Sequence, residues 1–295
     1  MYIKRIFANT SATTQFLLLA FFLLIGATLS FTLTTGLMLF FPESSTRLMQ
    51  EPSLLRIIQF SSAICAFLLP AIAMAWTCGN RPTEYLSLKW IKSGRVWLFM
   101  LGGLFLLSPT INLLGTFNQA ITLPSFMAPI EEWMRAQEEA AAQLTTILLS
   151  NDHIETLIAN LFVIAATAGL TEEFLFRGAL QRVIGRCTNN PHIIIWMSAI
   201  LFSAFHLQFY GFLPRMILGA YFGYLLYWSK SIWLPVFAHF TNNAIAVIGM
   251  SNSQLKDNEF ISGEISQEHI LVFSLLAILC LVLFFWLNKR LKSLL

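Results

Sequence analysis

Two neighbouring glutamates and an arginine interrupt an apolar stretch in the sequence GLTEEFLFRGALQ, residues 169–181. Glu173 and Arg177 are four residues apart, with the acid N-terminal to the base, which is the favoured order for an ion pair on one helix face. Glu172 lies about 100° around the same helix and has no basic partner on that helix. We interpret Glu173 as a paired structural acid and Glu172 as a carboxylate that points into the protein interior. The alternative is an ion-paired helix end in which both acids only stabilise packing.

Two of the five histidines lie inside apolar segments further along the chain. His206 follows Phe202 by four residues in FSAFHL, and His239 precedes Asn243 by four residues in HFTNNA, so each pair shares a helix face. A single histidine in such a place is more often a hydrogen-bonded packing residue. Two of them, with an unpaired glutamate and an amide, form a set that can hydrolyse a peptide bond.

This set of side chains allows two mechanisms of hydrolysis. In the first, Glu172 takes a proton from water. Imidazole or amide N–H groups of His206, His239 and Asn243 then stabilise the oxyanion. In the second, Glu172, His206 and His239 hold a zinc ion that lowers the pKa of its bound water. The sequence does not choose between these mechanisms.

Other chemistries lack their signatures. The sequence contains no H-E-x-x-H zinc helix, no G-x-S-x-G elbow and no glycine-rich phosphate loop. Its four cysteines lie far apart, without a C-x-x-C pair. Because a basic aromatic patch is also missing, we expect no nucleic-acid partner.

The composition places these residues in a membrane. The chain is 57% hydrophobic and 11% charged, whereas about a quarter of the residues in a soluble domain are charged. A membrane-spanning helix needs about 20 apolar residues, and the chain has several runs of that length. We predict an all-α polytopic membrane protein, a bundle of about eight transmembrane helices with an outer amphipathic helix. The predicted spans are 15–41, 54–76, 96–116, 154–176, 192–208, 211–229, 232–250 and 269–288.

The basic residues predict the orientation, because Lys and Arg accumulate in cytoplasmic loops. With the N-terminus in the cytoplasm, thirteen of the 18 Lys and Arg residues fall on the cytoplasmic side, including Lys4, Arg5 and Arg177. We therefore predict that both termini are cytoplasmic. The outer side keeps Arg47, Arg56, Arg135, Arg215 and Lys256.

Three regions follow from this layout. Residues 1–153 form an N-terminal transmembrane region of three spans. It ends with an amphipathic helix that begins at Pro129 in PIEEWMRAQEEAAAQLTTILL and packs on the outer end of the bundle. Residues 154–250 form the catalytic core, and residues 251–295 form the last span and a cytoplasmic tail.

Three short motifs, in this order and each on its own apolar segment, resemble the signature of a known family. This is the CPBP family, also called the Abi family, which contains the type II CAAX prenyl proteases and their bacterial relatives. The resemblance implies an intramembrane endopeptidase of a prokaryotic cell membrane. Its partners would be membrane lipid and a membrane-associated peptide or protein substrate, with or without a prenyl group. The motifs are Glu172-Glu173-x-x-x-Arg177, Phe202-x-x-x-His206 and His239-x-x-x-Asn243.

The resemblance also implies a role for each motif residue. Glu172 would activate water with the help of His206, while His239 and Asn243 would form the oxyanion site. The family is commonly labelled as metalloproteases, and a metal-free glutamate mechanism has also been argued for it, so zinc stays open as a cofactor. The supporting residues would be Glu173, Arg177 and Phe202.

Two non-proteolytic functions stay open beside hydrolysis. Buried acids and histidines also build proton relays in transporters. A membrane scaffold or immunity protein could retain the same motifs for folding alone.

The predicted spans make one demand on the structure. By residue count, Glu172 and His239 fall in the inner half of the bilayer, and His206 lies nearer the outer side. A shared site requires helix tilt, a later start of the fifth span or a different end of the fourth. We predict that the Glu172 carboxylate and both imidazoles lie within about 10 Å of one another.

Overall fold

The computed structural model describes residues 6–40, 51–149, 153–252, 254–255, 258–263 and 265–295. Within these ranges the chain is helical and has no strand, so the predicted all-α class is confirmed. Residue 41 of the first predicted span lies outside the described residues, as do the basic residues Lys4, Arg5, Arg47 and Lys256.

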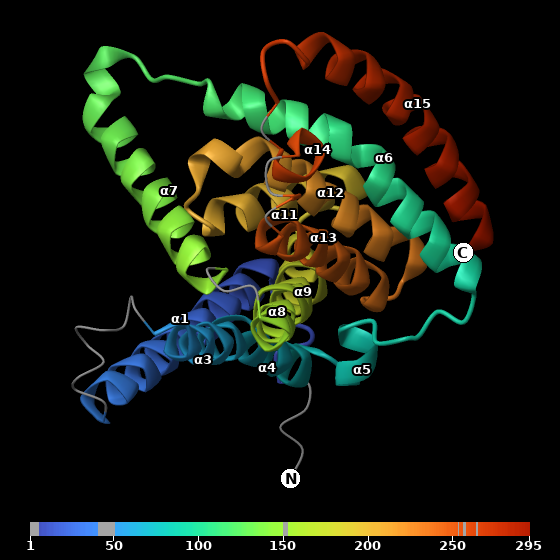
Figure 1. Ribbon diagram of the computed structural model, residues 1–295. Coiled ribbons are helices and arrows are strands. Elements are labelled where there is room, and N and C mark those ends of the chain that lie inside the picture. The colour runs from blue at the N-terminus through green and yellow to red at the C-terminus, as the bar shows by residue number, and fades with distance from the viewer. Residues whose placement is uncertain (1–5, 41–50, 150–152, 253, 256–257, 264) are drawn as a thin grey trace.

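Four helical segments form the N-terminal part. The first long helix, α1, lies against a second one that runs through α3, a wide π-helical turn η2, and α4 without interruption. Figure 1 shows these two helices crossing beneath the rest of the bundle, while α6 lies on its far side. The bounds are α1 Ala12–Phe40, α3 Pro52–Ala63, η2 Ile64–Leu68, α4 Leu69–Cys78, α5 Pro82–Tyr85 and α6 Gly94–Gln119.

The amphipathic helix exists as predicted. It is α7, Ala128–Leu148, preceded by the short 3-10 turn η3, Ser125–Met127. Its Trp133 ring lies 5.3 Å from the ring of Phe209, and Glu138 Oε2 accepts a hydrogen bond from the backbone N–H of Tyr210 at 3.3 Å. One face of α7 therefore packs on the turn that follows His206.

The helix that carries the two glutamates is continuous from Ile154 to Ile184. The predicted span 154–176 therefore ended too early. Sequence reasoning assigned Arg177 to a cytoplasmic segment, but its side chain is only 1% exposed and lies inside the bundle. The segments are α8 Ile154–Asn160, η4 Leu161–Thr167, α9 Ala168–Glu173, η5 Phe174–Leu180 and α10 Gln181–Ile184.

Two wide turns interrupt this helix, one on each side of the glutamates. Both η4 and η5 are π-helical, and the regular stretch α9 between them holds Glu172 and Glu173 at its end. π-Helical turns are rare and occur frequently at functional sites.

The C-terminal half surrounds this helix. Helix α13 packs against η4 and α9 on one side and against α12 on the other, and α11 pairs with α12. Figure 1 shows α6 and α15 running side by side along the outside of this group. The bounds are α11 Pro191–Phe205, η6 Phe209–Gly211, α12 Phe212–Ser229, α13 Trp233–Ser251, α14 Glu259–Ser262 and α15 Ile270–Leu294.

Five helices of the described residues are long and apolar enough to cross a membrane: Ala12–Leu39, Pro52–Cys78, Gly94–Gln119, Ile154–Ile184 and Ile270–Leu294. The other three predicted spans are present as α11, α12 and α13, which are not among the five, so the number of eight stays a prediction. Large apolar side chains on α1 and α15 are exposed, among them Phe31, Leu271 and Phe285. Such faces are suited to lipid, and the chain is an integral membrane protein.

Candidate active site

Glu172, His206 and His239 converge from three different helices. Glu172 Oε2 lies 3.7 Å from Nε2 of His206 and 3.9 Å from Nε2 of His239. Both distances are much shorter than the separation of about 10 Å that the sequence predicted. The helix that carries Glu172 continues to Ile184, so Glu172 lies nearer the middle of this helix than the predicted span placed it.

The two glutamates have different surroundings, as the helical spacing indicated. The Glu173 side chain is fully buried, and its Oε1 accepts a hydrogen bond from Arg177 Nη1 at 2.8 Å. The Glu172 side chain is 14% exposed, and its Oε2 has no hydrogen-bond partner among the described residues. Glu173 therefore belongs to the dry interior, whereas Glu172 faces a partly accessible space.

Arg177 joins three elements from a buried position. Besides Glu173, its guanidinium donates from Nη2 to the Gly219 carbonyl of α12 at 3.0 Å. It also lies 4.3 Å from the centre of the Phe202 ring of α11, within the range of a cation–π contact. Glu173, Arg177 and Phe202, which the sequence assigned supporting roles, thus form one cluster.

His239 lies between the two carboxylates. Its Nδ1 is 2.8 Å from Glu173 Oε1, the oxygen that also accepts from Arg177. Since a carboxylate oxygen shared in this way acts as an acceptor, His239 Nδ1 carries the proton of this bond. The ring stacks on Phe222 at 5.2 Å, and its Nε2 is thereby directed to Glu172.

His206 occupies the first position after α11. Its Nδ1 lies 2.9 Å from the Phe202 carbonyl, so Nδ1 donates and a neutral ring presents the Nε2 lone pair to Glu172. The next residue, Leu207, has a φ of 54°, a left-handed conformation that costs a non-glycine residue about 1 kcal/mol or more. Strain of this kind persists where surrounding contacts fix the chain.

Arg215 supplies such contacts, although its sequence position had identified it only as one of the cations on the outer side. It donates from Nη1 to the Gln208 carbonyl at 3.1 Å and from Nη2 to Gln208 Oε1 at 2.8 Å. Its charge also interacts with Glu172 and His206. Arg215 lies near the start of a helix, seven residues after Gln208, and this spacing was the available signal for their contact. The turn that brings the Arg215 side chain to Gln208 could not be predicted from the sequence.

Asn243 lies one turn beyond His239 on α13. Its Nδ2 donates to the Ile164 carbonyl in η4 at 3.1 Å, and its Oδ1 accepts from Asn242 Nδ2 at 3.2 Å. The amide therefore links α13 to the wide turn that precedes the glutamates. The second N–H of this amide is the group that an oxyanion role would use.

The close approach of α13 to α9 depends on Gly169. A Cβ atom at this position would lie 3.0 Å from the backbone nitrogen of Phe240 and 3.2 Å from the carbonyl oxygen of Val236. Both neighbours are main-chain atoms of the helix that carries His239, so neither can rotate away. A residue without a side chain thus sets the distance between Glu172 and His239.

We expect Gly169→Ala to lower the stability of the protein by about 1–3 kcal/mol, because α13 must move outward to admit the methyl group. Thermal unfolding of the detergent-solubilised protein would measure the effect. Gly115→Ala is the matched control, since a Cβ at Gly115 of α6 meets nothing within 4 Å. Equal unfolding temperatures for the two variants would contradict the role assigned to Gly169.

The fit of a metal ion can be tested on the donor set. Glu172, His206 and His239 have the donor chemistry of a zinc site, and both histidines hold Nδ1 in a hydrogen bond that leaves Nε2 facing the carboxylate. In the described part of the chain, however, no group of three or more His, Cys, Asp or Glu side chains is arranged to hold a metal ion.

Comparison with known proteins locates a family domain over this site. Residues 154–245 match the family described as type II CAAX prenyl endopeptidase Rce1-like. The matched segment contains all three motifs, from Glu172 to Asn243. No curated protein and no solved structure matches the chain. The predicted relationship to the CAAX proteases is thereby confirmed.

Proposed function

We propose that this protein, whose residues 154–245 match the type II CAAX prenyl endopeptidase family, is an intramembrane endopeptidase that hydrolyses a peptide bond of a membrane-associated substrate. The observation that carries the proposal is the convergence of Glu172 Oε2 with Nε2 of His206 and Nε2 of His239. The family match supports a peptidase, and the apolar helices around the site support a substrate held at the membrane.

In the proposed reaction, Glu172 is the general base. The two distances of 3.7 and 3.9 Å exceed a direct hydrogen bond, which is the spacing at which a water molecule can bridge polar groups. Glu172 takes one proton from the water, and the resulting hydroxide forms a bond to the carbonyl carbon of the substrate. His206 Nε2 accepts the second hydrogen bond of the water and so fixes its orientation. The proton on Glu172 then passes to the leaving amine as the C–N bond breaks.

His239 stabilises the oxyanion in this proposal. With its Nδ1–H directed to Glu173, the ring can donate from Nε2 only when it is the doubly protonated cation. The charges of Glu172, Glu173, Arg177 and His239 then sum to zero, and Arg215 adds a positive charge that also acts on Glu172. When the proton moves to Glu172, the negative charge moves from its carboxylate to the oxyanion. Both positions lie beside the His239 cation, so the site needs little rearrangement during the reaction. The second N–H of Asn243 is the additional donor.

Arg215 is a positioning residue in this proposal. Its two hydrogen bonds to Gln208 hold the strained turn at Leu207. This turn fixes the position of His206, the first residue after α11. No step of the reaction requires the Arg215 guanidinium to contact the substrate.

Cleavage of defined peptides tests the function. We expect the purified protein to hydrolyse a peptide with a C-terminal CAAX sequence, and to cleave the farnesylated form faster than the unmodified form, because its site lies among apolar helices. Mass spectrometry of products formed in ¹⁸O-water should show one ¹⁸O atom in the new carboxylate. A stable protein that cleaves neither peptide would favour the scaffold. Proton-driven flux in vesicles without cleavage would favour the transporter.

The same preparation tests the cofactor. Metal content is measured on the active protein, and cleavage is repeated after treatment with a zinc chelator. The reaction through the chain's own residues predicts full activity without bound metal. Activity that is lost on chelation and restored by zinc would instead assign Glu172, His206 and His239 as zinc ligands.

A further inference from the structure

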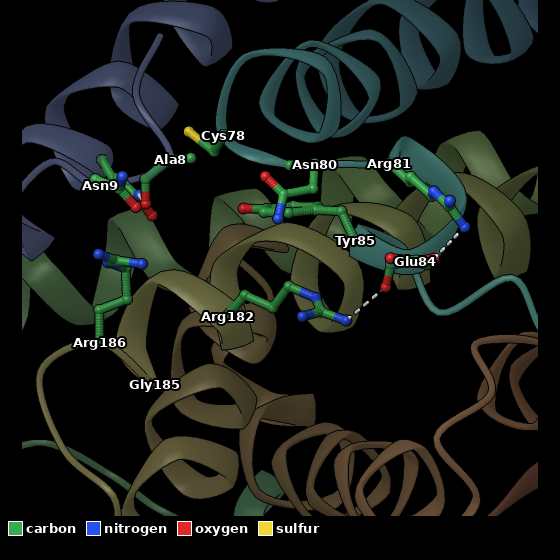
Figure 2. Close-up of a pocket in the computed structure, with 12 residues that line it drawn as sticks. Ala8, Asn9, Cys78, Asn80, Arg81, Glu84, Tyr85, Arg182, Gly185 and Arg186 are labelled. Carbon is green, nitrogen blue, oxygen red and sulfur yellow. Dashed lines mark hydrogen bonds and ion pairs between the residues drawn. The ribbon is translucent and has the colours of Figure 1, made fainter. Parts of the chain in front are cut away.

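A second polar site lies at the far end of the glutamate-bearing helix. It is a pocket of about 540 Å³ between the N-terminal segment, the end of α4, α5 and α10. Figure 2 shows it with Ala8 and Asn9 on one side, Cys78 and Asn80 above, and Arg182 and Arg186 below. None of the residues of the candidate active site lines this pocket.

The pocket is positively charged. Its lining contains three arginines, Arg81, Arg182 and Arg186, against one glutamate, Glu84. Arg81 and Glu84 form an exposed ion pair at 3.1 Å, so their charges offset each other. The surplus is carried by Arg182 and Arg186, which lie one helical turn apart and whose charges both act on the Tyr85 side chain.

Both surplus arginines keep donors for a ligand. Within the described residues, the hydrogen bonds of Arg182 to Glu84 O and Ser87 Oγ engage Nη2 alone. Arg186 likewise engages Nη2 alone, on the Thr10 carbonyl at 3.0 Å. A guanidinium has five N–H donors, and its planar fork matches phosphate oxygens. The bonds to the protein thus orient the two side chains without exhausting them.

Tyr85 adds an unsatisfied donor. Its hydroxyl is buried and has no hydrogen-bond partner among the described residues, although it lies in the pocket wall. Burial raises the pKa of the Tyr85 phenol, so the hydroxyl keeps its proton and can donate. A buried hydroxyl without a partner is costly, and such groups are generally satisfied by a bound molecule or water.

The surroundings indicate which phosphate would bind. The pocket lies at the end of the bundle that the distribution of Lys and Arg assigns to the cytoplasm. Gln15 of α1 lines the pocket, and the two residues that follow it, Phe16 and Leu17, are apolar and more than half exposed. Basic pockets between helices on the cytoplasmic side are suited to anionic headgroups.

We propose that the pocket lined by Tyr85, Arg182 and Arg186 binds the phosphate of an anionic phospholipid headgroup, with the acyl chains along α1. The bound lipid would connect the N-terminal segment to α10 and so stabilise the end of the helix that carries the glutamates. The site is independent of the proposed hydrolysis, because it shares no residue with it.

Thermal unfolding of the delipidated full chain in detergent tests this proposal. The protein is titrated with dioctanoyl phosphatidylglycerol, dioctanoyl phosphatidylcholine and inorganic phosphate. We expect phosphatidylglycerol to raise the unfolding temperature at about tenfold lower concentration than either of the others, since a ligand that binds the folded state stabilises it. Equal effects of the two lipids, or of phosphatidylglycerol and inorganic phosphate, would overturn the assignment.

Two variants locate the site. Arg186→Gln should raise the phosphatidylglycerol concentration required by about tenfold, which is the effect of losing one charge-assisted hydrogen bond. Tyr85→Phe should also weaken the response, while the unfolding temperature without lipid stays equal or rises because an unsatisfied hydroxyl is removed. Arg290→Gln, an exposed cation of α15 outside the pocket, is the control and should respond as the wild type does. Wild-type responses from both pocket variants would exclude the site.

Discussion

Replacing Glu172 with glutamine should lower the rate of peptide cleavage by about 10²–10⁴-fold while the protein stays folded, because that is the usual contribution of a general base. The amide has nearly the same shape as the carboxylate but cannot take a proton from water. Its position also predicts a small effect on folding, because Glu172 Oε2 has no hydrogen-bond partner among the described residues to lose. Steady-state cleavage of the CAAX peptide and thermal unfolding would measure the two quantities.

Glu155→Gln is the matched control for this experiment. Glu155 is an exposed acid at the start of the same continuous helix, so its loss should leave cleavage unchanged. Glu172→Gln that retains cleavage would remove the general-base role. Glu172→Gln that unfolds the protein would instead support the alternative in which both acids only stabilise packing.

Replacing Arg177 with methionine should destabilise the protein by about 3–5 kcal/mol, because it leaves the Glu173 carboxylate buried without its strongest partner. The methionine side chain also gives up the hydrogen bond to the Gly219 carbonyl and the contact with the Phe202 ring. We expect a lower unfolding temperature and a lower yield of folded protein. Arg81→Met, which breaks an exposed pair with Glu84, should change the unfolding temperature little.

A double variant separates stability from catalysis in this cluster. Glu173→Gln combined with Arg177→Met removes both buried charges, and replacement of a whole buried pair is often neutral or stabilising. The double variant should therefore unfold at a higher temperature than Arg177→Met alone. It should still fail to cleave peptide, since His239 loses the carboxylate that holds its Nδ1 proton. A double variant that cleaves peptide at the wild-type rate would refute the role of Glu173 in holding His239.

The different surroundings of Glu172 and Glu173 were predictable, because they depend only on residue spacing within one and a half turns of a helix. The pairing of Glu173 with Arg177 needs nothing beyond the i, i+4 rule, and the structure places both as expected. The grouping of His206 and His239 with Glu172 followed from the motifs and their resemblance to a family. Local spacing therefore identified the paired and the unpaired acid, and the motifs with their family resemblance identified the other candidate residues.

Features that depend on other segments were not predictable. Arg177 was taken as the end of the fourth span because an arginine inside a bilayer is unfavourable. Its partners Gly219 and Phe202, distant in the sequence, make the buried position tolerable. The turn that returns Arg215 to Gln208, and the link between Asn243 and Ile164, are likewise tertiary contacts.

The wide turns η4 and η5 determine the direction in which Glu172 points. Each π-helical turn closes its hydrogen bond over one residue more than an α-helical turn, so it shifts the angular phase of everything after it by about 100°. The phase of α9, and with it the direction of Glu172, is thus separated from the phase of the two helix ends. Without the wide turn η4, Glu172 would face a different side of the bundle relative to the helix start at Ile154, away from His206 and His239.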